Sequence, residues 1–341
     1  MFLSLIAALL AATATYAQGS LVAVLGHEGN LTAFYGAEAL ASALEAATDG
    51  DVITLSSGRF GAADITKAVT IRGAGMTVDE EAKIFPTMLV GDFSINIPEE
   101  TSQRLTMEGL YCDNNNYVTV AGTLKNVAFM KCRFYNFSSD TYSSMQNIAF
   151  IHCKIADALS LSGGKSVSFV NCFVNRASIG SSSDSGESYE FTNCVLGLSV
   201  FSSSSRFNSY NAIYRNCIIC YQFNATGYMG TSNLVYRTLG ISTGNMFANL
   251  SSTTNSWYNA SSFSDVFKTY DGTYSDTEDF ELTDEAKAAY LGDDGSEVGI
   301  HGGNQPFSPN LTSPTITKFV VAPKSTSEGK LSVDIEVKAG N

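Results

Sequence analysis

The chain has 341 residues and a formal net charge of −13, and charged residues make up only 16% of it. This length is enough for one large domain or two ordinary ones. Ser, Thr, Asn and Gly lie between short apolar runs, which predicts many short strands, an all-β fold class, rather than amphipathic helices. The net charge disfavours a nucleic-acid partner, because the chain has no basic field that would release phosphate counterions.

Residues 1–17 are predicted to be a signal peptide. The apolar run "MFLSLIAALL" is followed by small residues, with Thr15 and Ala17 at the −3 and −1 positions of a cleavage site. The segment before the run has no Lys or Arg, so an apolar N-terminal strand or an anchor stays open as an alternative. The run is short for a membrane span. We therefore predict an exported protein, secreted or at the cell surface, that is not an integral membrane protein.

Residues 18–50 are predicted to form an N-terminal cap. Within them, residues 37–47 have the pattern of a short amphipathic helix. Such a helix covers the open end of a strand stack, whose edge otherwise invites aggregation.

From Leu105 onward the chain repeats with a period near 21 residues. One ladder of equivalent positions contains Leu105, Val127, Ile148, Val167, Tyr189 and Ala212, and the next, two residues later, contains Met107, Phe129, Phe150, Phe169, Phe191 and Tyr214. Three residues further come Leu110, Cys132, Cys153, Cys172, Cys194 and Cys217. Steps of two keep side chains on one face of a strand, and the step of three indicates one bend. The period favours stacked coils, so residues 51–305 are predicted to form a right-handed parallel β-helix of about ten to twelve coils, from the span divided by the period.

The cysteine ladder is predicted to be a buried file of free thiols, because cysteine is small and apolar enough for the inside of a bend. Disulfides and a metal site are the alternatives, but neither CxxC pairs nor a histidine cluster accompanies the cysteines. The residue before each cysteine lies on the bend. There, asparagine tolerates turn conformations and can bond its stacked neighbours.

Three stretches resemble the pectin-lyase-like, right-handed parallel β-helix proteins that bacteria export. They are "YGAEALASALEAATDGDVITLSSGRF", the first coil "ITKAVTIRGAG", and the repeat from "LTMEGLYC" onward. The resemblance covers residues 34–305, and it implies that "YLGDDGSEVGIHGG" is a closing coil. The family that the chain resembles includes lyases, hydrolases and proteins of unassigned function. The resemblance therefore implies the fold and leaves the chemistry open.

Residues 306–341 are predicted to be a linker followed by a C-terminal strand pair around "SEG". The acidic residues are concentrated just before this region. Ten of them, with a single lysine, lie between Asp271 and Ile300.

Four stacked basic residues are the weak candidates for a catalytic site: Lys131, Arg133, His152 and Lys154. They form either a solvated surface with counter-ions from loops or a subsite for an acidic glycan with one base as proton acceptor. Tyr135, Phe173 and Arg176 are weak candidates for substrate binding. Paired carboxylates are absent from the regular strands, since Glu108 and Glu190 lie four coils apart, about 19 Å. We predict no metal site and no cofactor.

Two functions from different classes remain. The first is an exported, non-catalytic β-helix protein that binds carbohydrate or serves at the cell surface. The alternative is a polysaccharide lyase acting on an acidic, uronate-containing glycan, and a purely structural spacer is a third possibility. The glycan, a polysaccharide partner and the oligomeric state are left open by the sequence.

Overall fold

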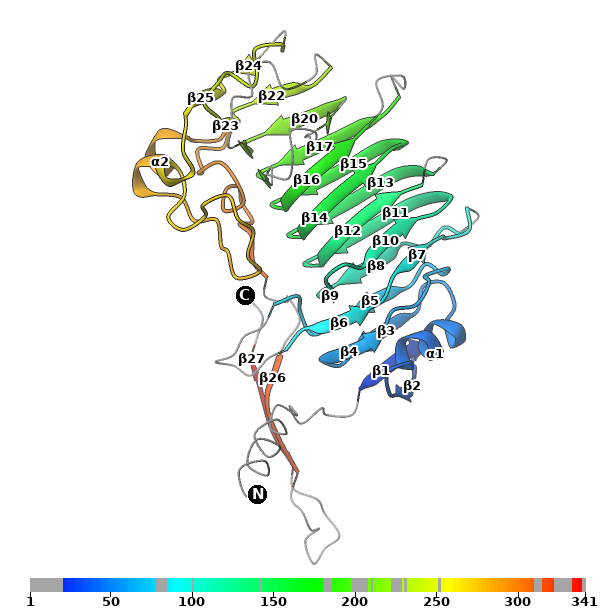
Figure 1. The fold of residues 1–341 in the computed structure, drawn as a ribbon. Helices are drawn as coiled ribbons and strands as arrows, with labels where there is room; N and C mark the ends of the chain where they lie inside the picture. Colours follow the sequence, from blue (N-terminus) through cyan, green and yellow to red (C-terminus); the bar gives the residue numbers. More distant parts are fainter. Residues whose placement is uncertain are drawn as a thin grey trace, which may run out of the picture.

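The structure is a computed structural model that describes residues 21–77, 85–99, 101–140, 143–180, 186–197, 208–209, 211–221, 229, 232–250, 253–309, 315–321 and 333–338. Its body is a stack of parallel coils, in which two large sheets run side by side along the stack (Figure 1). The stack makes about eight turns, fewer than the ten to twelve predicted, because the chain leaves the stack after β25. The predicted all-β fold with parallel, stacked coils is confirmed. The predicted signal peptide, residues 1–17, lies outside the described residues.

The first sheet has 12 strands. In spatial order they are β2 (Asn30–Tyr35), β1 (Val22–His27), β3 (Val52–Leu55), β5 (Thr70–Arg72), β8 (Leu105–Glu108), β11 (Thr123–Met130), β13 (Ser144–Ile151), β15 (Gly164–Val170), β17 (Ser188–Thr192), β20 (Ala212–Arg215), β22 (Leu234–Tyr236) and β24 (Thr253–Thr254).

The second sheet has 13 strands. Its main path contains β4 (Gly58–Gly61), β6 (Thr87–Val90), β9 (Leu110–Cys112), β12 (Arg133–Ser139), β14 (Lys154–Leu161), β16 (Phe173–Ile179), β18 (Val195–Leu196), β21 (Ile218–Cys220), β23 (Leu239–Ile241) and β25 (Trp257–Ala260). Three further strands lie off this path: β7 (Phe93–Ile95), β10 (Tyr117–Val120) and β19 (Asn208–Ser209).

The N-terminal end of the stack carries one helix, α1 (Ala39–Ala46), and the antiparallel hairpin β1–β2. The helix lies within the predicted range and buries Ala39, Leu40, Ala43 and Leu44. The hairpin was not predicted. Because β1 pairs antiparallel with β3, the hairpin extends the first sheet beyond the first coil.

The main core lies between the two sheets, and aromatic rings form its axis. Phe129, Phe150, Phe169, Phe191 and Tyr214 stack face to face, with centroids 4.8, 4.6, 4.5 and 5.2 Å apart along the file. Parallel strands in register place equivalent residues directly above one another, about 4.8 Å apart. The second sequence ladder is therefore a continuous stack of rings.

Each coil bends where the cysteine ladder predicts. The residue before the cysteine has a positive φ in successive coils, for example 51° at Lys131, 48° at Asn171 and 55° at Asn216. This left-handed conformation turns the chain sharply and favours Gly and Asn. The next residue then points inward, so that Cys132, Cys153, Cys172, Cys194 and Cys217 form the predicted buried file.

The cysteines also hold the bend by hydrogen bonds. The Cys172 thiol lies 3.4 Å from the carbonyl of Phe150 one coil below and 3.3 Å from that of Val170. The same pair of contacts recurs along the file, and Thr238 makes it with a hydroxyl in the coil after Cys217. The position therefore requires a small side chain that can donate a hydrogen bond. Threonine meets this requirement as well as cysteine, so Thr238 occupies the equivalent position in the coil after the predicted regular repeat.

A second bend, present in several of the coils, was missed. The residue just before the first ladder is also left-handed, with φ of 56° at Asn126, 57° at Asn147 and 56° at Asn211. At this second bend two asparagines in neighbouring coils are hydrogen-bonded to each other: Asn147 Nδ2 donates to Asn126 Oδ1 at 2.7 Å.

All seven cysteines are buried and free, as predicted. Cys217 faces the main core, whereas Cys220 faces the opposite side of its strand. Burial raises the pKa of the Cys132 thiol to about 12, so little of the reactive thiolate forms near neutral pH.

We expect a thiol reagent to label close to seven cysteines in unreduced, denatured protein and almost none in the native protein. Denaturation removes the burial that suppresses ionisation and access. Colorimetric titration at the same pH with and without guanidinium measures both values. A count near one in the denatured, unreduced protein would show that disulfides had formed.

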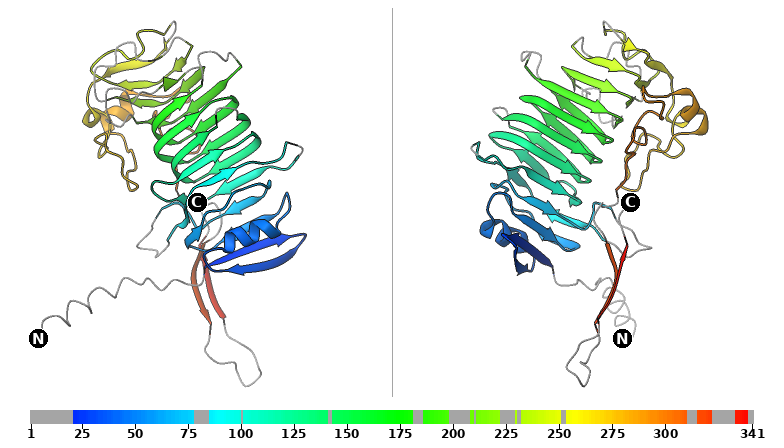
Figure 2. Two further views of the ribbon diagram at one scale, coloured as in Figure 1. Left: turned by 45° about the vertical axis from the view of Figure 1, so that its right-hand side comes forward. Right: turned by 180° about the vertical axis from the view of Figure 1, so that it is seen from behind.

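The chain after β25 does not form the predicted closing coil. Residues 261–309, which we call the return segment, leave the last coil and run back along the outer face of the second sheet (Figures 1 and 2). The segment contains the short helices η1 (Phe263–Asp265) and α2 (Asp284–Ala289) and isolated antiparallel bridges. Its main-chain groups therefore do not continue the parallel ladder of the predicted β-helix, residues 51–305.

In residues 306–341, β26 (Thr315–Val321) and β27 (Val333–Lys338) pair antiparallel in a separate two-stranded sheet.

Candidate functional site

The return segment covers a second hydrophobic core on the outer face of the second sheet. Phe173, Val195, Ile218 and Leu239 point outward from successive strands and pack against apolar side chains of the return segment. Phe173, predicted to be exposed for substrate binding, is fully buried, and its ring stacks on Phe280 with centroids 4.3 Å apart. An outward direction on the strand thus did not mean exposure to solvent.

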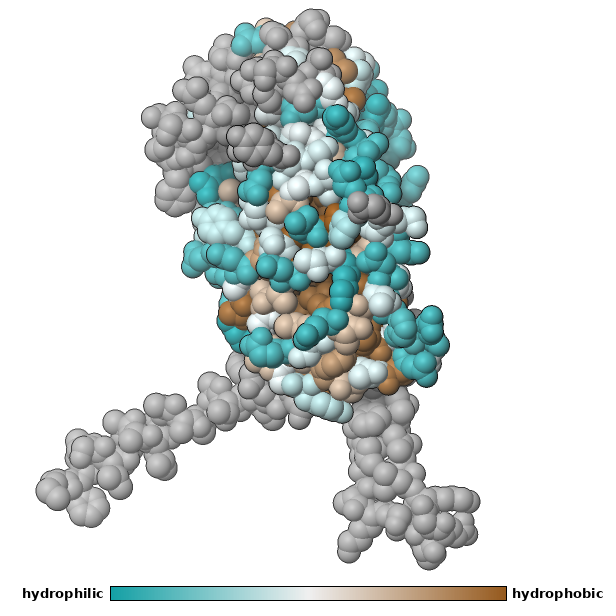
Figure 3. All heavy atoms as spheres, turned by 90° about the vertical axis from the view of Figure 1, so that its right-hand side faces the viewer, coloured by the Kyte–Doolittle hydropathy of each residue, from teal (hydrophilic) through white to brown (hydrophobic). Residues whose placement is uncertain are grey.

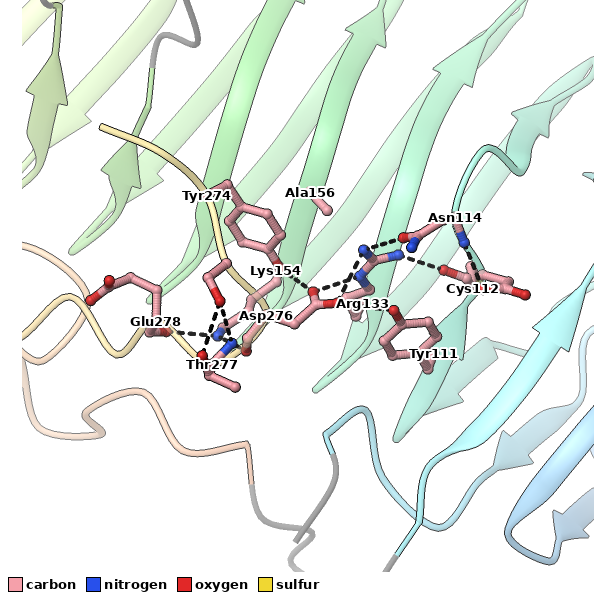
Figure 4. A network of polar contacts seen from close by, with 12 residues as sticks. Tyr111, Cys112, Asn114, Arg133, Lys154, Ala156, Tyr274, Asp276, Thr277 and Glu278 are labelled. Carbon is pink, nitrogen blue, oxygen red and sulfur yellow. Dashed lines mark hydrogen bonds and ion pairs between the residues drawn. The ribbon is translucent and has the colours of Figure 1, made fainter. Parts of the chain in front are cut away.

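Arg133 is the most heavily bonded of the predicted basic residues (Figure 4). Its Nε donates to Asp276 Oδ1 at 3.0 Å, one terminal nitrogen donates to the Cys112 carbonyl at 2.9 Å, and the other donates to Asn114 Oδ1 at 2.7 Å. The guanidinium carbon also lies 4.4 Å from the ring centroid of Tyr111. Arg133 therefore links the return segment to two coils of the solenoid.

Asp276 receives further support from two tyrosines. Tyr274 Oη donates at 2.6 Å and Tyr111 Oη at 3.0 Å. Burial opposes ionisation of Asp276, but the hydrogen bond from Tyr274 and the charge of Arg133 outweigh it and hold the pKa of this carboxyl below its ordinary value. The carboxylate stays ionised and paired at neutral pH.

Lys154 lies next to Arg133 on the neighbouring strand and also serves the return segment. Its Nζ donates to the carbonyls of Asp276 at 3.0 Å and Glu278 at 2.8 Å (Figure 4). Burial lowers the pKa of Lys154 to about 8, against the opposing effect of Asp276. The ammonium is therefore still mostly protonated at pH 7 and bound to main-chain oxygens.

Lys131 and His152 occupy adjacent bends and are both buried. His152 Nε2 lies 3.1 Å from the Gln305 carbonyl, while Nδ1 is buried without a hydrogen-bond partner. Burial lowers the pKa of both side chains. Neither residue is in the solvated environment that one reading of the sequence predicts.

The asparagines of the bend also contact the return segment. Asn171 Nδ2 donates to the carbonyls of Ile300 and Gly302, both at 2.8 Å, and Asn216 Nδ2 donates to Asp293 Oδ1 at 2.7 Å. The prediction that these asparagines bond their stacked neighbours is thus wrong for Asn171 and Asn216. The side chains at these bends instead hydrogen-bond to the return segment, which is distant in the sequence.

The glycines of "YLGDDGSEVGIHGG" fit this docking. A Cβ on Gly303, whose φ is 81°, would lie 2.2 Å from Asn193 Nδ2, and one on Gly299 would lie 2.7 Å from Ile218 Cδ1. Glycine is needed because the backbone approaches the solenoid closely. The motif that resembled a closing coil is a packing motif of the return segment.

The four basic candidates are therefore brought together, but they are neither solvated nor open to a substrate. Their exposed fractions are only 3–7%. Sequence reasoning missed Asp276 and Tyr274, although the concentration of acidic residues between Asp271 and Ile300 was a readable sign that this stretch complements stacked cations.

The other two substrate-binding candidates lie near each other on the outer face of the second sheet. Tyr135 of β12 is half-buried, and Arg176 of β16 forms an ion pair with Asp157 of β14. The strand between them bulges at Ala156 and Asp157.

The described residues contain no cluster of three or more His, Cys, Asp or Glu side chains close enough to hold a metal ion. Among the helices that the structure describes, none is both long and apolar enough to cross a membrane. One side of the body mixes hydrophilic, weakly polar and apolar side chains (Figure 3).

Comparison of the chain with known protein families, with curated proteins and with solved structures finds no match.

Proposed function

We propose that this chain is an exported, non-catalytic protein of the pectin-lyase-like β-helix type that binds carbohydrate at the cell surface. The observation that carries the proposal is the burial of all four candidate catalytic residues; Arg133, His152 and Lys154 also bond to the return segment. Their polar atoms hold the fold together, so the cations have a structural role that needs no substrate.

The lyase alternative is weakened by the geometry of its best base. A lyase base needs a lowered pKa, and the pKa of Lys154 is indeed lowered to about 8. However, Lys154 is only 4% exposed, and its Nζ already donates to two carbonyl oxygens. A substrate would reach it only if the return segment moved away.

Carbohydrate binding is supported by the surface that stays uncovered. The outer face of the second sheet beside the return segment carries hydroxyl, amide and aromatic side chains, which are the groups that hydrogen-bond and stack on sugars. Export, cell-surface location and the family assignment are parts of the proposal that come from the sequence.

The proposal predicts binding without turnover. Purified protein is incubated with a panel of neutral and uronate-containing polysaccharides, and the ultraviolet absorbance of unsaturated products is followed. Migration in gels that contain the same polysaccharides is compared with migration in a plain gel. We expect retarded migration on at least one polysaccharide and no absorbance increase.

Two outcomes would contradict the proposal. An absorbance increase that is lost in Lys154→Met but kept in Lys165→Met, whose side chain is exposed on the first sheet, would establish the lyase. Absence of both retardation and product on every polysaccharide would favour a purely structural spacer.

A further inference from the structure

A β-bulge interrupts the outer face of the second sheet. β12 and β14 pair at Phe134 with Ile155 and then at Asn136 with Ala158, so Tyr135 alone faces two residues of β14, Ala156 and Asp157. On the other side of β14, Asn175 of β16 faces the same two residues. Bulges re-aim side chains and occur often beside functional sites.

Four residues around this irregularity form what we call the bulge cluster: Tyr135, Asp157, Asn175 and Arg176. Asn175 is only 7% exposed, and its Nδ2 donates to the Ala156 carbonyl at 2.9 Å, but its Oδ1 is buried without a hydrogen-bond partner. Arg176 pairs with Asp157 through a terminal nitrogen, while its Nε is also buried without a partner. A buried acceptor and a buried donor therefore remain unsatisfied on consecutive residues.

Unsatisfied buried polar atoms are rare, because each loses its hydrogen bonds to water and gains none in the folded protein. A ligand that both donates and accepts hydrogen bonds would remove this cost at both atoms. Tyr270 of the return segment also lies close to Asn175, because both side chains pack against Gly197. A Cβ added to Gly197 would be 3.3 Å from Asn175 Oδ1 and 3.0 Å from Tyr270 Oη. The return segment thus forms one wall beside the cluster.

A file of hydroxyl groups continues from the cluster along the solenoid. Strand pairing places these residues in register on the outer face, one per coil: Ser94, Thr119, Ser138, Ser160 and Ser178. Ser178 follows Arg176 by two residues, and Ser160 and Ser178 are exposed. The hydroxyls recur about every 4.8 Å, the spacing of neighbouring strands.

We infer that the bulge cluster and the hydroxyl file bind a neutral, hydroxyl-rich glycan that runs across the coils; this rests on the proposed carbohydrate-binding function. Arg176 is partly exposed, so a shift of its side chain would let Nε donate to a sugar hydroxyl, whereas a sugar hydroxyl can donate to Asn175 Oδ1 only after the Tyr270 side chain moves aside. Tyr135 offers an aromatic ring at the side of the cluster. The charge of Arg176 is compensated by Asp157, so the cluster has no free cation for a uronate carboxylate.

The test compares the full chain with three variants on neutral glucans and xylans and on uronate polymers, using affinity electrophoresis. Ser178→Arg places a bulky side chain on the exposed file, and Asn175→Ala removes the unpaired acceptor. Ser188→Arg is the matched control, because Ser188 is an exposed serine on the first sheet. Thermal unfolding of each variant shows that it is folded.

We expect Ser178→Arg and Asn175→Ala to weaken binding to a neutral glycan by about tenfold or more, equivalent to the loss of one good hydrogen bond, and Ser188→Arg to bind like the unmodified chain. If the unmodified chain binds but Ser178→Arg binds equally well, the assigned surface is wrong while the proposed function stands. Binding restricted to uronate polymers would contradict the inference that the ligand is neutral, while the proposed carbohydrate-binding function would stand. No binding to any polysaccharide would overturn both.

Discussion

Replacement of Phe169 by alanine is expected to lower the free energy of unfolding by about 3–5 kcal/mol, the cost of truncating a buried phenylalanine. The ring is fully buried and lies in the middle of the aromatic file, 4.6 Å from the Phe150 centroid and 4.5 Å from that of Phe191. Backbone pairing fixes the coils above and below, so they cannot close the cavity. Equilibrium unfolding in urea, followed by circular dichroism, measures the change.

Two variants make the Phe169 result specific. Phe169→Leu keeps most of the volume and should cost clearly less than alanine. Tyr117→Ala removes an aromatic ring that is 54% exposed, and it should change stability by no more than about 0.5 kcal/mol. A loss below about 1 kcal/mol for Phe169→Ala would mean that the file is not the continuous core described above.

Replacement of Arg133 by methionine is expected to release part of the return segment and to lower stability by about 2–3 kcal/mol. Removal of one partner of a fully buried ion pair costs about 3–5 kcal/mol, and the loss here is smaller because the Asp276 side chain is 41% exposed and partly screened. Methionine keeps the apolar stem but leaves Asp276 without its cationic partner and the Cys112 carbonyl without the donor that Arg133 supplied.

Hydrogen exchange separates this local effect from general destabilisation. Amides of residues 274–280 should exchange faster in Arg133→Met, whereas those of β13 and β15 should keep their protection. Arg59→Met is the control, because Arg59 pairs with Asp113 at a half-exposed position and should leave the return segment unchanged. Equal acceleration in both variants would contradict the docking role of Arg133.

Acid should act on the same contact. The pKa of Asp276 is lower in the folded protein than its ordinary value, so this pair contributes stability above that value and loses it as the pH falls through the folded pKa. The expected signature is a lower protection factor of residues 274–280 in acid, after correction for the intrinsic pH dependence of amide exchange, and the same low protection already at neutral pH in Arg133→Met.

The sequence by itself determined the coil. The ladders through Phe129 and Cys132 record which side chains point inward, and strand alternation with one bend is enough to order them, because each coil contacts only its neighbours about 21 residues away. For the same reason the free, buried state of the cysteines followed from local geometry. The second bend at Asn126 and Asn147 was also written in the sequence, as a recurrent asparagine, although it was not interpreted as a bend.

Only the tertiary structure decided what the outward side chains do. Arg133, Lys154 and Phe173 alternate correctly to the outer face, yet the return segment, more than 100 residues away in the chain, buries them. The bulge cluster likewise depends on a register shift between β12 and β14 that no single strand reveals. Local periodicity specifies the direction of a side chain, whereas its exposure depends on which distant segment packs over it, and that is set by the summed contacts of the whole fold.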